Sequence, residues 1–338
     1  MVQGRFKHSI IIFLLGIGFF AVKPLQAQDP QFGHFYSNSM LYNPAFTGNV
    51  DLGRFALSYR NQWPSIPGNY ISYAASYDHY FSEIKSGVGL QFVNDRAGSG
   101  GLTNRSINFM YSYQIRLNRE LSLMAGIKGG YHFRFYDFSK FTFADQIARD
   151  DAPESIVNGF RDRINFPNFG NGLVFYHQED YWLGVSFDHL NQPTNGFVDE
   201  ESSLDIRTAI QAGYNFKVNK GYGGRAGGKV TAAALYKSQR EWDQLDLGLY
   251  YRTEPYLFGI WYRGLPLKSN ESDIPNVDAI MLLAGFKADR ITFAYSYDVT
   301  ISRLAGSTGG SHELSLILEY PKAKRRNKRF FRVPCPKF

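Results

Sequence analysis

The residue types that could support catalysis lie at scattered positions, and none belongs to a complete catalytic motif. Asp188 and His189 are adjacent at the end of a predicted strand, and such a pair could carry out general acid–base chemistry in a hydrolase. A hydrolase of this kind also needs a Ser or Cys nucleophile positioned by a motif, and the sequence contains no such motif. We therefore interpret His189 as a contact in a loop or at a strand end, and predict no enzyme activity.

Two acidic pairs and one glycine-rich run are equally weak indications of a ligand site. Glu200 with Glu201, and Glu271 with Asp273, could offer oxygen ligands to calcium, but their spacing matches no defined calcium-binding loop. The run 98–101 lacks the Lys and the following helix of a phosphate-binding loop, and it fits a turn between strands better. The sequence therefore predicts no catalytic residue, no cofactor and no metal.

Charged and small residues instead alternate with aromatic and aliphatic ones. In residues 291–298 the apolar positions are Ile291, Phe293, Tyr295 and Tyr297, and the alternating positions are Thr292, Ala294, Ser296 and Asp298. A period of two indicates a β-strand with one apolar face. No helical segment is long or periodic enough to cover that face. Lipid is therefore the simplest cover, and the polar face lines the lumen of a closed barrel.

The alternation places seven charged residues on the lumen face, among them Asp246 and Glu319. The five predicted lumen charges are Arg60, Arg252, Arg263, Asp298 and Glu313. A charge facing the membrane midplane would cost about 2–4 kcal/mol, so charges on the inner face avoid lipid and can pair across the interior. A lumen filled by paired charges fits a scaffold better than a wide diffusion pore. An unplugged barrel of this size could nevertheless pass a small solute.

The fold class predicted is all-β: a transmembrane, antiparallel, up-and-down β-barrel of the outer-membrane type, with about fourteen strands. The predicted strands are 51–60, 69–80, 86–94, 103–116, 120–135, 168–177, 179–188, 204–216, 226–238, 241–252, 255–264, 275–288, 290–298 and 311–320. Connections after even-numbered strands are mostly short, and those after odd-numbered strands are mostly longer. Because such barrels have short periplasmic turns, we expect both termini in the periplasm.

Four regions are predicted along the chain. Residues 1–27 have the charged start, apolar core and small final residue of a secretory signal peptide, with cleavage after Ala27. Residues 28–50 have no strand pattern, and form either a periplasmic entry segment or a plug in the lumen. The barrel spans 51–320, and a basic periplasmic tail spans 321–338. The only cysteine is Cys335, which excludes an internal disulfide and an N-terminal lipid anchor.

The basic character of the chain belongs to its ends. The net charge is +7, but the tail carries eight basic residues with no acid and the signal carries three, which leaves −4 for residues 28–320. The sequence pI of 9.2 therefore does not indicate nucleic-acid binding. The tail is either a solvated run or a docking segment for an acidic partner or for lipid headgroups.

Several blocks, in order along the chain, carry a family resemblance. They are QDPQF at 28–32, Tyr36, NPAFTG at 43–48, YRNQWP at 59–64, DRAG at 95–98, FADQ at 143–146, DHLNQP at 188–193, WYRG at 261–264, YSYDVT at 295–300 and GSHE at 310–313. As a set they resemble the PorP/SprF family of the Bacteroidota type IX secretion and gliding motility system. The basic end with PCPKF at 334–338 is similar to that family's tail.

The resemblance implies an outer-membrane barrel surrounded by lipid that works with type IX components, either periplasmic ring or peptidoglycan-associated proteins. It also implies secreted cargo, such as an adhesin, with a C-terminal sorting domain of the type B class. The family brings no catalytic residues. The residues that could contact a partner are Asn43, Pro44, Phe46, Arg60 and Trp63 in the matched blocks and Lys324, Arg325 and Arg326 in the tail. For the matched blocks, packing in turns and at the barrel rim is the alternative.

The leading hypothesis is a non-enzymatic outer-membrane barrel that couples the secretion machinery to, or anchors and receives, exported surface proteins. The alternative is a passive outer-membrane transporter of small hydrophobic or polar solutes, which the polar lumen face would permit.

Overall fold

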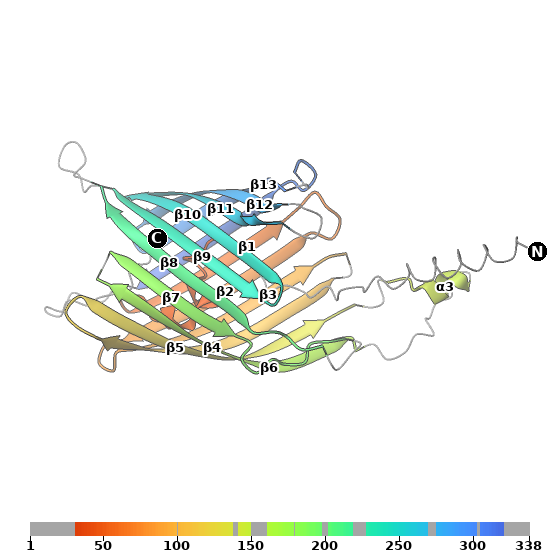
Figure 1. Cartoon of the computed structure of the whole chain (residues 1–338), viewed down its shortest axis with the longest axis horizontal. Helices are drawn as coiled ribbons and strands as arrows, with labels where there is room; N and C mark the ends of the chain where they lie inside the picture. Colours follow the sequence, from red (N-terminus) through yellow and green to blue (C-terminus); the bar gives the residue numbers. More distant parts are fainter. Residues whose placement is uncertain are drawn as a thin grey trace, which may run out of the picture. The chain divides into compact units, whose positions relative to one another are not determined.

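The computed structural model describes residues 31–99, 101–137, 141–149, 161–178, 180–197, 202–218, 228–269, 275–302 and 305–320. The chain divides into two compact units, Met1–Gln31 and Phe32–Phe338, and the described residues fall almost entirely in the second. The strands of this second unit run side by side around a barrel (Figure 1).

Fourteen strands form one closed antiparallel sheet, which confirms the predicted fold class. They are β1 (Gly53–Gln62), β2 (Tyr70–Phe81), β3 (Ser86–Ala97), β4 (Leu102–Arg116), β5 (Leu121–Phe135), β6 (Arg163–His177), β7 (Tyr181–Asp188), β8 (Arg207–Lys217), β9 (Lys229–Gln239), β10 (Trp242–Thr253), β11 (Tyr256–Ser269), β12 (Pro275–Ala288), β13 (Ile291–Thr300) and β14 (Ser311–Tyr320). Each strand pairs with its neighbours in sequence, and β1 pairs with β14 to close the ring.

The two faces of the wall differ as the alternation requires. On β13, Ile291 and Phe293 are each 48% exposed on the outer face, whereas Ala294 and Asp298 are buried on the inner face. The other strands expose large apolar side chains outward in the same way. This outer surface is suited to lipid, since membrane-spanning barrels place their apolar band there.

Several strands extend beyond their predicted ends, and β6 and β11 extend furthest. β6 begins at Arg163, five residues early, because residues 163–167 continue to pair with Tyr131–Phe135 of β5. β11 continues to Ser269, after a register shift between Arg263 and Gly264. In β6 the extension alternates in the opposite sense, with Phe166 buried on the inner face and Arg163 and Asn165 exposed, so it lacks the apolar outer face that identified the other strands. In β11 the irregular pairing disrupts the alternation.

The connections separate the two ends of the barrel. At one end, named the turn end, they are residues 82–85, 117–120, 178–180, 218–228, 254–255 and 289–290; β1 starts and β14 ends here too. At the other end, named the loop end, they are 63–69, 98–101, 136–162, 189–206, 240–241, 270–274 and 301–310. The exceptions to the length order are 218–228 and 240–241, as the sequence predicted.

The helices of the described residues are short: α2 (Ser39–Tyr42), the 3-10 helix η1 (Pro44–Phe46) and α3 (Ala144–Ala148). None of them is long and apolar enough to cross a membrane. Asn43 caps η1, because its side chain accepts a hydrogen bond from the Ala45 N–H, and Pro44 occupies the first helical position.

Candidate functional site in the barrel lumen

The segment Phe32–Val50, named the plug from here on, lies inside the barrel. Every residue of the plug is buried except Leu41, which is half-buried. The rings of Phe35, Tyr36 and Phe46 pack together, and Tyr36 stacks edge-on against Tyr250 of β10 with their centroids 4.5 Å apart. These contacts place the described residues 32–50 within the lumen, whereas residues 28–30 of the predicted segment lie outside the described residues.

Glycines on the inner face let the plug approach the wall. A Cβ added at Gly126 of β5 would lie 2.4 Å from the backbone nitrogen of Ala45, and one added at Gly87 of β3 would lie 2.3 Å from the Thr47 carbonyl oxygen. Both distances are far inside van der Waals contact, and the atoms met belong to the plug backbone. A side chain at either position would therefore displace the plug.

The plug runs from the loop-end half of the barrel to the turn end. Phe32 packs against Ala74 of β2 and Val93 of β3, which both lie nearer the loop ends of their strands. At its other end the plug leads into β1, which starts at Gly53 at the turn end. The described chain thus begins in the loop-end half, whereas β14 ends at the turn end.

A chain of alternating charges, named the Arg60 cluster, crosses one side of the lumen. The Arg60 guanidinium lies 2.7 Å from the Asp298 carboxylate and 3.2 Å from that of Glu313. Arg263 lies 3.4 Å from Asp298 and 3.1 Å from Asp246. These five side chains come from five strands and are at least nine-tenths buried. Each charge has an opposite charge beside it, which offsets the cost of burying it.

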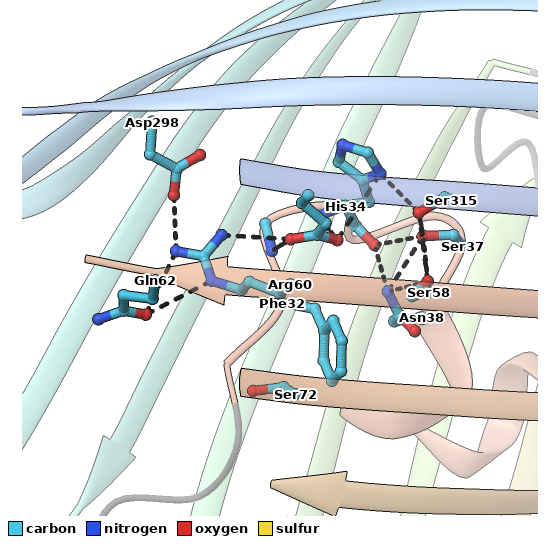
Figure 2. Close-up of polar contacts among 12 residues, drawn as sticks. Phe32, His34, Ser37, Asn38, Ser58, Arg60, Gln62, Ser72, Asp298 and Ser315 are labelled. Atoms are coloured by element: carbon cyan, nitrogen blue, oxygen red, sulfur yellow. Dashed lines mark hydrogen bonds and ion pairs between the residues drawn. The ribbon is translucent and has the colours of Figure 1, made fainter. Parts of the chain in front are cut away.

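Glu313 connects this cluster to the plug. Its Oε2 accepts a hydrogen bond from the Gly33 backbone N–H at 2.6 Å, and its Oε1 accepts one from the His34 N–H at 3.1 Å. The same carboxylate accepts from Arg60 (Figure 2). A buried carboxylate with three donors is held by charge-assisted hydrogen bonds, which are roughly twice as strong as neutral ones.

His34 lies beside this carboxylate and is completely buried. Its Nδ1 is 2.7 Å from the Ser315 hydroxyl, and Figure 2 shows Ser37, Asn38 and Ser58 extending the hydrogen bonds around it. Burial lowers the pKa of the His34 imidazole below 6.5, because the charged form loses its hydration, and this outweighs the opposite effect of Glu313. His34 is therefore neutral when the plug is in place at neutral pH.

The Asp188 cluster lies on the opposite side of the strand order, over β5 to β8. The Asp188 carboxylate pairs with the Lys128 ammonium and lies 2.8 Å from the Arg207 guanidinium. Among the described residues its other hydrogen-bond donors are the Asn168 side chain and the His189 backbone N–H. All four partners belong to the wall or to the residue that follows β7, so this carboxylate does not hold the plug directly.

Hydrogen bonds from the Asn43 amide and from the Arg207 guanidinium attach the plug beside the Asp188 carboxylate. The Asn43 amide donates to the Leu173 and Val185 carbonyl oxygens, each at 3.2 Å, and to Gln211 at 3.0 Å. Arg207 donates to the Leu41 carbonyl at 3.3 Å. The wall here offers carbonyl groups and one guanidinium, whereas on the other side it offers a carboxylate.

Four of the five predicted lumen charges are brought together in the Arg60 cluster: Arg60, Arg263, Asp298 and Glu313. Arg252 is not among them. It has the inward parity of β10 but lies next to the strand end, where it pairs with the exposed Glu254 at 3.0 Å. Parity fixes the face of a strand and not the depth along the barrel, so Arg252 has the predicted face but lies where its charge reaches water.

The residues predicted to contact a partner occupy different places. Asn43, Pro44 and Phe46 are buried in the lumen, so a partner could reach them only if the plug moved. Trp63 lies in the β1–β2 connection at the loop end, half-buried, with its ring 5.7 Å from that of Tyr70. Lys324, Arg325 and Arg326 lie outside the described residues, as do the acidic pairs considered for calcium and Cys335.

The predicted set of lumen charges omitted the Asp188 cluster. The alternation does place Lys128 on a polar inner face, and Asp188 was considered only with His189, as an acid–base pair at a strand end. That Lys128, Asp188 and Arg207 meet depends on the register of β5 to β8, which one sequence does not give. Within the described part of the chain, no group of three or more His, Cys, Asp or Glu side chains is arranged to hold a metal ion.

The sequence matches a family model described as "Type IX secretion system membrane protein PorP/SprF" over residues 25–318. The chain belongs to the PorP/SprF family. With the closed fourteen-strand sheet, this membership makes it an integral outer-membrane protein of the type IX secretion system. PorP/SprF proteins are secretion-system membrane barrels and not an enzyme family.

The other comparisons give similar solved structures and no further assignment. No curated protein matches the sequence. Similar solved structures include Omp33 from Acinetobacter baumannii (7% identity, TM-score 0.47, covering 81% of this chain and 100% of that one) and the P. putida toluene transporter TodX (12%, 0.45, 85% and 95%). A Pseudomonas aeruginosa FadL homologue is 14% identical, with a TM-score of 0.41, covering 82% of this chain and 92% of that one.

Proposed function

We propose that this PorP/SprF protein is a closed, non-enzymatic platform in the outer membrane. It anchors or receives exported surface proteins, or couples the secretion machinery to periplasmic components. The observation that carries the proposal is the plug: the barrel interior is occupied by Phe32–Val50 and by paired charges that hold it. A barrel built this way offers a partner its two ends, and not its lumen.

The plug also favours this function over passive transport. A solute crossing the barrel would have to displace buried aromatic rings, the carboxylate hydrogen bonds at Gly33 and His34, and the Asn43 amide. Losing the bonds of a single buried charge already costs several kcal/mol, typically about 3–5. A steady open pore therefore does not fit the interior.

We further propose that the turn end faces the periplasm and the loop end faces outward, since outer-membrane barrels place their short turns in the periplasm. The basic tail follows β14 at the turn end and would face periplasmic partners. The N-terminal end of the plug begins in the loop-end half instead, so only the C-terminal side is included in this proposal.

Affinity purification tests the platform. The full chain, with a tag inserted in the exposed β1–β2 connection, is extracted from outer membranes in mild detergent, beside an unrelated barrel carrying the same tag. We expect type IX components or an exported protein with a C-terminal sorting domain to be enriched with this chain alone. Recovery of the barrel without either class would contradict the proposal.

Planar-bilayer recordings separate the platform from the transporter. The purified native chain should give no steady conductance, because the plug stays in place. Stable open-channel currents from the native chain, with folded barrel verified by its gel mobility, would favour the transporter.

A further inference from the structure

The outer face of the wall carries a group of arginines at the loop end of neighbouring strands. Arg96 of β3, Arg105 of β4 and Arg163 of β6 are all exposed. Arg96 pairs across the sheet with Ile71, and Arg105 lies two residues from Ile107, which is 48% exposed on the outer face. These side chains therefore point away from the lumen, so they are not part of the charge pairing that holds the plug.

An aromatic ring and an amide organise the group. The guanidinium carbon of Arg105 lies 5.2 Å from the centroid of Phe135 of β5, and that of Arg163 lies 5.1 Å from the same centroid. Arg105 Nε also donates to the Asn94 side chain at 2.9 Å. Stacking on a ring holds a guanidinium in position and leaves its outer N–H groups free to face an anion.

Among the described residues, no carboxylate pairs with Arg105 or Arg163, in contrast to the cations of the lumen. The exposed Arg240, in the 240–241 connection at the same end, is paired instead, because it lies 3.8 Å from the Asp205 carboxylate. Arg105 and Arg163 therefore place positive charge without a described carboxylate partner over β4 to β6, which lie side by side in the sheet.

The group lies directly above the apolar band. From the loop end towards the turn end, β4 presents Arg105, then Ile107 and Phe109, of which the last is 55% exposed. β3 likewise presents Arg96 and Asn94 before Phe92. This order along a strand, with the cation nearest the loop end and the exposed ring after it, suits the boundary between lipid headgroups and hydrocarbon. Aromatic rings lie at that boundary, and cations lie beyond it among the headgroups.

We propose that Arg96, Arg105 and Arg163 form a binding site for the phosphate groups of lipid headgroups, and specifically for the phosphorylated glycolipid of the external leaflet. The lipid is already in place beside the apolar band, so its headgroup meets guanidiniums that pair with phosphate in a bidentate manner. The choice of leaflet rests on the orientation proposed above, whereas the choice of phosphate rests on the arginines alone.

The site is tested on the delipidated full chain in detergent by native mass spectrometry with added lipid A. The double variant Arg105→Ala with Arg163→Ala should bind lipid A about ten- to thirtyfold more weakly, since each cation near a charged headgroup contributes roughly a factor of five. Arg252→Ala with Arg290→Ala, at the turn end, removes the same charge and should bind as the native chain does.

Further binding measurements distinguish lipid phosphate from free phosphate and one class of lipid from another. Lipid A stripped of phosphate should bind native chain and arginine variant equally, and inorganic phosphate at millimolar concentration should not displace lipid A. Stronger binding of phosphatidylglycerol than of lipid A would overturn the assignment to the external leaflet. Equal lipid A binding by the double variant and the native chain, or an equal loss in the turn-end control, would overturn the site itself.

Discussion

The Arg60 cluster and the Asp188 cluster are built from the same residue types but hold different things. In the Arg60 cluster a carboxylate, Glu313, bonds to two backbone N–H groups of the plug. In the Asp188 cluster the carboxylate bonds only to groups of the wall and the residue after β7, among the described residues, and the plug is attached beside it by the Asn43 amide and by Arg207. The carboxylate of one cluster fastens the plug to the barrel, and the carboxylate of the other fastens strands to one another.

The difference shows how a barrel interior can separate two tasks. A carboxylate that accepts from backbone N–H groups can hold any segment that presents two of them, so the plug's first residues are held by geometry and not by their side chains. A carboxylate between Lys128 and Arg207 neutralises cations that would otherwise repel each other in the wall. Substitution of Glu313 in the Arg60 cluster should therefore loosen the plug, whereas substitution of Asp188 should destabilise the wall.

The largest effect on the plug is expected from Glu313→Ala. Removing one partner of a buried, hydrogen-bonded charge costs about 3–5 kcal/mol, and here the loss falls on the docking of Gly33 and His34. Arg60 retains Asp298, so the wall should be less affected. Hydrogen-exchange mass spectrometry of the plug peptide should show faster exchange at its first residues.

Glu319→Ala is the matched control, because Glu319 is on the same strand and pairs with Lys287 at the turn end, where both side chains are about a quarter exposed. A pair of this kind contributes at most about 1 kcal/mol. Plug exchange should stay as in the native chain. If Glu313→Ala also leaves plug exchange unchanged, the distinction between the two clusters is wrong.

The next effect is expected from Asp188→Asn, in the wall. The amide keeps the size and some hydrogen bonds of the side chain but leaves Lys128 and Arg207 without their shared anion, at a cost of about 3 kcal/mol. The barrel should convert to its unfolded gel mobility at a lower temperature, while exchange at Gly33 and His34 stays slow. Asp243→Asn, whose native carboxylate accepts from the Tyr236 hydroxyl, is the control. Rapid plug exchange with an unchanged transition temperature would assign Asp188 to the plug instead.

A steric change should act on the plug without touching either cluster. Gly126→Ala places a methyl group 2.4 Å from the Ala45 backbone, and overpacking of this kind costs about 1–3 kcal/mol. Gly129→Ala on the same strand faces outward and meets nothing closer than 3.8 Å, so it is the matched control. Exchange should rise around residues 43–47 in the first variant only. Equal exchange in both variants would mean that the plug does not lie against β5 as closely as described.

The sequence predicted the barrel wall far better than it predicted the plug that fills the lumen. Alternation on β13 fixes which residues face outward, because a slip of one residue would expose every charge to lipid. The same rule placed Arg60, Asp298 and Glu313 on the inner face, but parity carries no information on depth, and Arg252 accordingly fell at the rim. The family could also be predicted from the sequence, because the segments that resemble it are spread along the whole barrel.

The plug could not be predicted in the same way. Its contacts join residues far apart in the chain, such as Asn43 with Gln211, and no local pattern encodes such a pair. Several of its polar groups bond to the wall, as the Tyr42 carbonyl does to Ser186, so residues 28–50 fit a periplasmic entry segment as well as a plug when the sequence is read alone. The inner-face glycines at 87 and 126 were the available indication, because they leave room for a backbone.

The smallest effect expected is a pH dependence carried by His34. Its pKa is lowered by burial, so above 6.5 the imidazole is neutral whether or not the plug is docked, and docking is fully stable. As the pH falls below that value the released plug takes up a proton that the docked one does not, and docking weakens.

Between about pH 7.5 and about pH 5.5, plug exchange corrected for its intrinsic rate should therefore rise in the native chain. His34→Asn removes this titration, and its exchange should vary less, while His312→Asn on the outer face should follow the native chain. Identical pH profiles for the native chain and His34→Asn would show that protonation of His34 does not govern how firmly the Arg60 cluster holds the plug.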